Sequence, residues 1–142
     1  MIALLVVSIG LLGIASLQLT AMNQNTSSLN HSQAVQYAYN MSDRIRANMG
    51  EFEQYKGIDT DIGYNQDCEG SACNPAEMRD ADAADWEDMV ANLPGGRGMI
   101  FDNVDGLTVV VMWDDDGTGA TGTGCNPTVA TDLTCYSLVV AQ

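Results

Sequence analysis

The first 42 residues contain no Asp, Glu, Lys or Arg, and this uncharged stretch limits what the chain can fold into. It opens with the run MIALLVVSIGLLGIASL, and apolar residues continue as far as Met22. As a helix, about 22 residues would measure about 33 Å, the thickness of a bilayer core. A helix that is apolar on all sides must lie in lipid or among other helices. We therefore expect residues 1–24 to form a hydrophobic transmembrane segment and residues 25–142 a separate globular part.

Small residues are spaced closely along this segment, at Ser8, Gly10, Gly13 and Ser16. Such residues let helices approach one another in lipid. A secretory signal peptide cleaved near Ser16 is the alternative, because small residues also mark cleavage sites. We favour the helix, since the chain lacks a cationic start and continues in a helical pattern.

That continuation is an apolar stripe with steps of three and four residues, the repeat of one helix face. It runs through Ala34, Ala38, Met41, Ile45, Met49 and Phe52. No Gly or Pro interrupts residues 14–49. The pattern predicts one rod from residue 1 to about residue 49, on the order of 70 Å long, that ends at Gly50.

The charged residues all follow this uncharged stretch and are mostly acidic. The chain has 19 acidic and five basic residues, for a formal net charge of −14. Binding to nucleic acid requires a surface of Lys and Arg, and binding to anionic lipid headgroups requires the same. The charge argues against both kinds of partner.

Four cysteines, Cys68, Cys73, Cys125 and Cys135, lie in segments rich in Gly, Asp, Asn and Pro. An even number in such segments indicates two disulfides and an oxidising compartment, with three possible pairings. We favour the local pairs Cys68 with Cys73 and Cys125 with Cys135. Reduced thiols and a four-cysteine zinc site are the alternatives, although the spacings differ from the short zinc knuckle.

The second half of the chain predicts a short helix and three strands. Residues 50–80 are expected to form a loop, and residues 82–93 an amphipathic helix that ends at Pro94. Residues 98–103 and 107–113 are rich in β-formers, and Asp105-Gly106 between them indicates a hairpin. A polar loop at 114–134 leads to a third strand at 135–140. The predicted class is α+β, with a small antiparallel sheet that covers the amphipathic half of the long helix.

The acidic run DDDGTG at 114–119 is a weak calcium candidate, through Asp114 and Asp116. Its fifth and twelfth positions are Thr118 and Cys125, where an EF-hand loop has Asp or Asn and a bidentate Glu, so we favour a solvated turn. His31 is the only histidine, and we expect it to be solvated. No nucleophile with a base and an orienting group can be assembled, so we predict no enzyme activity and no cofactor.

Several segments resemble type IV pilins, most closely minor pilins of the PilV type, known as type IV pilus modification proteins. The run IALLVVSIGLLG at 2–13 is similar to the hydrophobic start that pilins and pseudopilins share. The more specific segments are SQA at 32–34, AYNMSDRIRAN at 38–48, LPGGRG at 93–98 and VMWDD at 111–115. The cleavage motif and glutamate that precede this start in the family do not stand before Met1. The sequence is therefore expected to be truncated at or after that motif, with a methylated N-terminus upstream of Met1.

The resemblance implies a pilin-like fold and a structural role that primes pilus assembly and modifies the fibre, and so influences adhesion or motility. The chain would sit in the inner membrane with a periplasmic domain and then enter an extracellular pilus. Its partners would be other pilin subunits, through the N-terminal helix, with no nucleic acid and no small-molecule substrate. The expected assembly residues are Ile2, Leu4, Leu5, Val7, Leu11, Leu12 and Ile14.

Three alternatives stay open. The first is a major pilin or a type II secretion pseudopilin, the second is a membrane-anchored periplasmic binding module, and the third is a cleaved, secreted protein.

Overall fold

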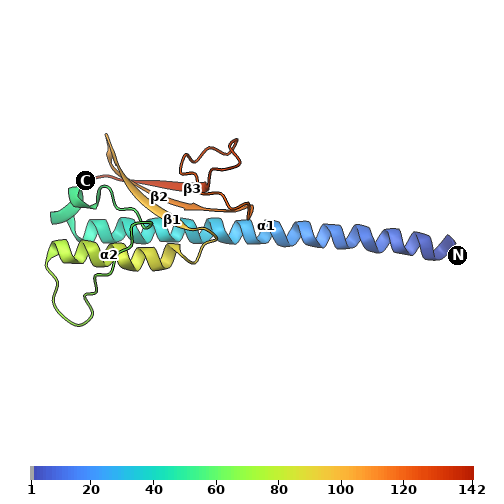
Figure 1. Ribbon diagram of the computed structural model, residues 1–142, viewed down its shortest axis with the longest axis horizontal. Helices are drawn as coiled ribbons and strands as arrows, with labels where there is room; N and C mark the ends of the chain where they lie inside the picture. The colour runs from blue at the N-terminus through green and yellow to red at the C-terminus, as the bar shows by residue number, and fades with distance from the viewer. Residues whose placement is uncertain (1) are drawn as a thin grey trace.

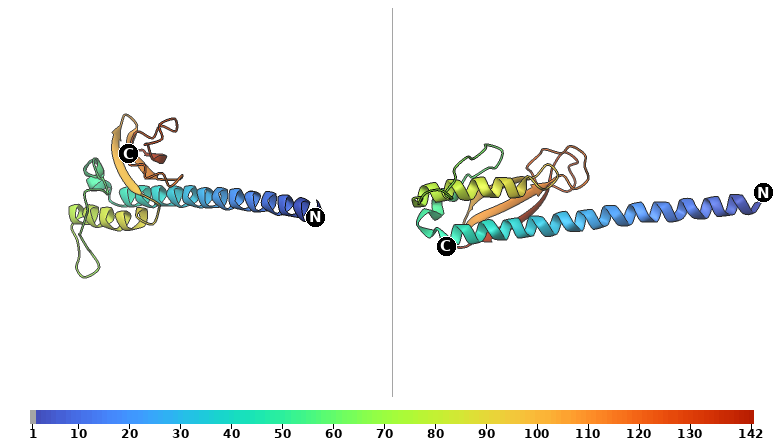
Figure 2. Two further views of the ribbon diagram at one scale, coloured as in Figure 1. Left: turned by 45° about the vertical axis from the view of Figure 1, so that its right-hand side comes forward. Right: turned by 90° about the horizontal axis from the view of Figure 1, so that it is seen from below.

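A computed structural model describes the backbone of residues 2–142 and the side chains of residues 7, 8 and 10–142. The elements along the chain are the helix α1 (Ile2–Ala47), the 3-10 helix η1 (Met49–Tyr55), the helix α2 (Pro75–Val90) and three strands, β1 (Arg97–Asn103), β2 (Gly106–Trp113) and β3 (Thr134–Val140). The sheet packs on one side of the C-terminal half of α1, and α2 runs alongside the same half (Figures 1 and 2). The predicted α+β architecture is confirmed.

The long helix α1 has 46 residues, which at 1.5 Å per residue is about 69 Å. Four members of the predicted stripe, Ala34, Ala38, Met41 and Ile45, are completely buried in the core. The prediction was wrong at Met49, whose side chain is 43% exposed. The reason is that α1 ends at Ala47, two residues earlier than predicted, and the tighter turn of η1 rotates Met49 out of the stripe.

The sheet has the order β1-β2-β3, and both pairs of strands are antiparallel. Alternate side chains point towards α1, as the two-residue repeat of a strand requires. Those from β2 are fully or almost fully buried, which places the centre of the core between β2 and α1. The inward side chains are Leu107, Val109, Val111 and Trp113, joined by Ile100 and Val140 of the flanking strands.

The predicted hairpin is present, but its turn is one residue earlier than expected. Val104 and Asp105 form the turn, and Gly106 is the first residue of β2. Gly106 has φ of +132°, and a Cβ there would lie 2.2 Å from the carbonyl oxygen of Val140. Glycine is therefore required because the end of β3 approaches the backbone closely.

The start of α2 corrects a second prediction, since the helix begins at Pro75 and not at Asp82. The Asn74 side chain accepts a bond from the Glu77 N–H (3.0 Å), and the Glu77 carboxylate accepts one from the Asn74 N–H (2.9 Å). This reciprocal pair is a capping box, and Pro75 suits the first helical position because its missing N–H would have no helical partner. Residues expected to be loop therefore form the first two turns of α2, and η1 occupies part of the same predicted loop.

The side chain of Trp86 holds α2 against the rest of the core. Trp86 is fully buried, and its Nε1 donates to the carbonyl oxygen of Tyr37 in α1 (3.1 Å). Its ring lies against Gly98 of β1, where an added Cβ would come within 2.5 Å of a ring carbon. The α2 helix is thus packed against both α1 and the first strand.

The opposite face of the sheet is covered at one end only. Val110, Met112 and Leu133 form a second buried cluster there, beneath the loop of residues 114–133. In Figure 1 this loop rises over the end of the sheet that faces the projecting part of α1. The hairpin end of the same face has no such cover.

Candidate assembly surface

The first half of α1 projects beyond the globular part and exposes an apolar surface (Figure 1). Every described side chain from Val7 to Thr26 is exposed. The expected assembly residues Val7, Leu11, Leu12 and Ile14 are exposed by 58%, 63%, 72% and 54%. The side chains of Ile2, Leu4 and Leu5 lie outside the described residues. A continuous apolar surface of this kind marks a site of association with protein or membrane.

The transmembrane segment predicted at residues 1–24 lies partly outside the residues whose side chains are described. Within the part of the chain whose side chains are described, no helix is both long enough and apolar enough to span a bilayer.

Asp115 fastens the globular part to α1 at the point where the helix leaves it. Its carboxylate accepts hydrogen bonds from Ser27 Oγ (2.6 Å), Asn30 Nδ2 (3.5 Å) and Trp113 Nε1 (2.9 Å). Partial burial disfavours the charged carboxylate, but these donors outweigh burial and hold the pKa of Asp115 below its usual range. The sequence analysis assigned Asp115 only to a solvated acidic turn and missed this role.

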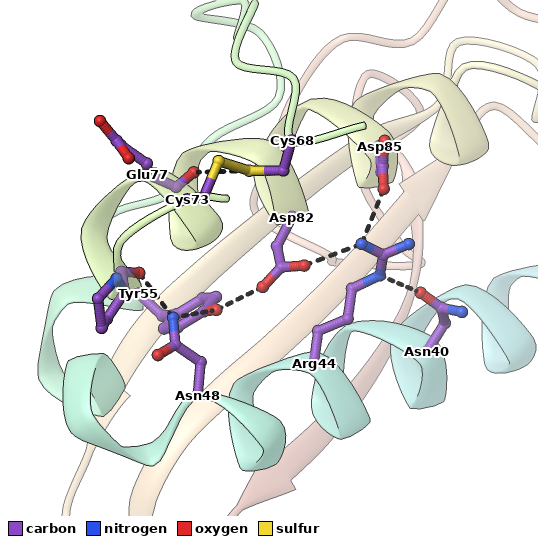
Figure 3. A network of polar contacts seen from close by, with 10 residues as sticks. Asn40, Arg44, Asn48, Tyr55, Cys68, Cys73, Glu77, Asp82 and Asp85 are labelled. Carbon is purple, nitrogen blue, oxygen red and sulfur yellow. Dashed lines mark hydrogen bonds and ion pairs between the residues drawn. A yellow bond between two sulfur atoms is a disulfide. The ribbon is translucent and has the colours of Figure 1, made fainter. Parts of the chain in front are cut away.

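A second polar network joins α1, η1 and α2 (Figure 3). Arg44 Nη1 donates to Asp82 Oδ1 and to Asp85 Oδ2, both at 2.9 Å, and Arg44 Nε donates to Asn40 Oδ1 (2.8 Å). The Asp82 side chain is only 8% exposed. Its other oxygen accepts a bond of 2.5 Å from the Tyr55 hydroxyl. Both oxygens of this buried carboxylate therefore have partners.

The pKa shifts of Arg44 and Tyr55 follow from their burial and their hydrogen-bond partners. Burial disfavours the Arg44 cation, yet the bonds to Asp82 and Asp85 outweigh that effect and raise the pKa of Arg44. Burial, together with the bond to Asp82, raises the pKa of Tyr55. The network is therefore an arginine cation, a carboxylate and a neutral phenol, an arrangement suited to holding elements together.

Several side chains of the segment AYNMSDRIRAN, residues 38–48, take part in this network. Within one stretch of helix, Arg44 provides the cation and Ile45 the buried apolar side chain. Asn48 Nδ2 donates to the Tyr55 hydroxyl (3.2 Å) and to the Pro75 carbonyl (2.8 Å). Asp43 and Arg46 form an ion pair with one another, at 3.4 Å on the surface. The segment, at the C-terminal end of α1, thus contacts both η1 and α2.

The cysteines form the two local disulfides that the sequence analysis favoured, Cys68–Cys73 and Cys125–Cys135. The first closes the loop before α2. The second fastens the loop of residues 114–133 to β3. The second disulfide therefore anchors a long connection to a neighbouring strand.

Of the two calcium candidates, Asp116 is exposed, and Asp114 bonds the backbone of its own turn. Asp114 Oδ1 accepts from the Thr118 N–H (3.0 Å), and Asp114 Oδ2 accepts from the Gly119 N–H (2.7 Å). The Gly119 bond is the main reason why the pKa of Asp114 is lowered. Asp114 thus folds its own turn, while Asp115 turns towards α1. Among the described residues, no group of three or more His, Cys, Asp or Glu could hold a metal ion.

His31 lies beside two aromatic rings, although its side chain is exposed as predicted. Its ring stacks on Trp113 with centroids 5.9 Å apart, and it meets the edge of Tyr136 at 6.0 Å. The contact places His31 at the same junction as Asp115.

Comparisons with known proteins agree with this arrangement over the middle of the chain. Residues 16–84 match a family model described as Tt1218-like, type IV pilin Tt1218. No curated protein matches the chain. No solved structure matches it either. The matched residues include the part of α1 that carries the Arg44 network, together with η1 and the start of α2.

Proposed function

We propose that this chain is a non-enzymatic structural subunit of a type IV pilus, in the role of a minor pilin that primes assembly and modifies the fibre. The observation that carries the proposal is an apolar half-helix exposed outside a folded domain, in a chain whose residues 16–84 match a type IV pilin family. A pilus core made of packed helices would bury such a surface. The PilV-type role rests on the sequence resemblance described above.

In this proposal residues 1–24 form the segment that enters the membrane and then the filament core, and residues 25–142 form the periplasmic and later surface-exposed domain. Transfer from lipid to a bundle of helices exchanges one apolar environment for another, so close packing decides the affinity. The residues proposed to pack are Ile2, Leu4, Leu5, Val7, Leu11, Leu12 and Ile14.

The test is Leu12→Asp, because Leu12 is 72% exposed on the projecting half of α1. A carboxylate in an apolar helix bundle costs about 2.5 kcal/mol or more, so incorporation into sheared filaments should fall at least tenfold. Ile62→Asp is the matched control, since Ile62 is 71% exposed on the globular domain. Quantitative immunoblots of filament and membrane fractions would report both variants. Equal incorporation of Leu12→Asp and wild type would contradict the packing role.

The alternatives predict different locations and amounts. A major pilin would dominate a count of subunits in sheared fibres, whereas a minor pilin would be scarce. A pseudopilin would be found with the type II secretion machine and not in type IV pili. A membrane-anchored binding module would stay in the membrane fraction when filaments are sheared away.

A further inference from the structure

The hairpin end of the sheet exposes apolar side chains on the face that points away from α1. Phe101, Val104 and Val139 are exposed by 43%, 98% and 44%, and we call these three residues the hairpin patch. Phe101 and Val139 flank Thr108 in the strand register, so they lie in one row across the sheet. Val104 stands at the tip of the turn that follows β1. The patch therefore extends from the sheet to its outermost turn, with the hydrogen-bonded pair Asn103 and Thr108 between its members.

Carboxylates border this apolar patch at its Val104 end, on the side that faces η1, and we call this border the rim. Glu53, Asp102 and Asp105 line a cavity of about 330 Å³ beside the hairpin, together with Val104. The nearby cation is Lys56, which is already ion-paired with Asp102. Since Lys56 neutralises only Asp102, the carboxylates of Glu53 and Asp105 leave the rim with a net negative charge.

The part of the chain that the structure describes has no unpaired Lys or Arg to balance this negative charge. All five Lys and Arg side chains are ion-paired within the chain, and seven of the 19 carboxylates take part in those pairs. The other 12 carboxylates have no cationic partner in the described part of the chain. A second copy would therefore bring further carboxylates to the rim and no free cation, which is unfavourable at contact distance.

We propose that the hairpin patch docks on a neighbouring filament subunit of different sequence, one that presents Lys or Arg around an apolar centre. The inference rests on the proposed function, because it takes the partner to be another subunit of the same fibre. The apolar centre would provide affinity, and the acidic rim would select a cationic surface and reject copies of this chain. Such selection would place this chain only next to subunits of another kind.

The experiment places a photo-crosslinking amino acid at position 104 of the full chain, in cells that also make the other filament subunits. Because Val104 is 98% exposed, the substitution leaves the fold intact. Mass spectrometry of cross-linked peptides should identify a Lys- or Arg-bearing peptide of another subunit. The double variant Glu53→Lys with Asp105→Lys should lower that cross-link at least fivefold, and so should raised salt.

The matched control places the same amino acid at Val129, on the loop over the opposite end of the sheet, where no such cross-link is expected. Three results would overturn the docking: no cross-link at position 104, a cross-link to a copy of this chain or to a protein outside the filament, or a yield unchanged by the charge reversal. Recovery of the chain in sheared filaments is scored separately. Its absence there would contradict the proposed function, while the cross-link read in whole cells would still decide the docking.

Discussion

Arg44 is the residue that makes the ion pairs between α1 and α2. Its side chain is 28% exposed, and it is the cation for Asp82, whose side chain is 8% exposed. A buried carboxylate without its cation is unfavourable, because desolvation is no longer compensated. The ion pair therefore matters less for the energy it adds than for the penalty that follows when one partner is lost.

Arg44→Met keeps much of the apolar stem and removes the charge. We expect the free energy of unfolding to fall by about 2 to 3 kcal/mol, because Asp82 is left with only the Tyr55 hydroxyl. Urea unfolding of the full chain in detergent micelles would measure the change. Arg46→Met is the control, since Arg46 and Asp43 are 50% and 76% exposed and such a pair contributes under about 1 kcal/mol. Equal decreases in the free energy of unfolding for the two variants would show that the buried ion pair stabilises the fold no more than the exposed one.

Among the elements, α2 depends most clearly on a local signal at its first turn. The capping box of Asn74 and Glu77 satisfies N–H groups that the helix itself cannot, and it sets the start of the helix seven residues before the predicted one. The early start brings Asp82 into the middle of α2, beside Arg44. The position of the buried ion pair is therefore linked to the cap.

Asn74→Ala removes the acceptor for the Glu77 N–H and should lower the free energy of unfolding by about 1 kcal/mol. Asn65→Ala, at an exposed position in the preceding loop, should leave it unchanged. Amide hydrogen exchange should also become faster in the first turn of α2 and stay unchanged in β2. Unaltered exchange in that turn would mean that Pro75 and packing suffice to start the helix.

At the scale of the whole molecule, the long helix and the sheet are joined at the Asp115 junction. Ser27 and Asp115 are 88 residues apart in the chain and 2.6 Å apart in space. Beyond this junction α1 projects freely from the domain (Figure 2). Asp115 therefore ties the sheet to α1 at the point where the apolar half-helix leaves the domain.

The junction should weaken in acid. The folded state lowers the pKa of Asp115, so its stabilisation is complete above the ordinary value of about 3.9 and is lost as the pH falls through the lower, folded value. At pH 7 the wild type should exceed Asp115→Asn in free energy of unfolding by about 1 to 2 kcal/mol. The gap should shrink below pH 4, as measured by urea unfolding at a series of pH values. A gap that is independent of pH would contradict the role of the charge.

The sequence alone determined those features that depend on neighbouring residues. The unbroken spacing of Ala34, Ala38, Met41 and Ile45 predicts one helix face, and all four side chains are buried. The β-rich runs predict three strands within one or two residues, and the short spacings of the cysteines favoured the local disulfides. The exposed apolar half of α1 could be anticipated as well, since its composition suits only lipid or other helices.

Only the tertiary structure decided the contacts between distant segments. Arg44 and Asp82 are 38 residues apart, and nothing in either neighbourhood marks one as the partner of the other. Asp115 lies in an acidic run whose three members look equivalent in the sequence, and the folded chain turns one of them towards α1. Met49 leaves its stripe because a 3-10 turn replaces the last turn of α1. Periodicity reports which face of an element is buried, whereas the partner of a buried polar group is determined only when the elements pack together.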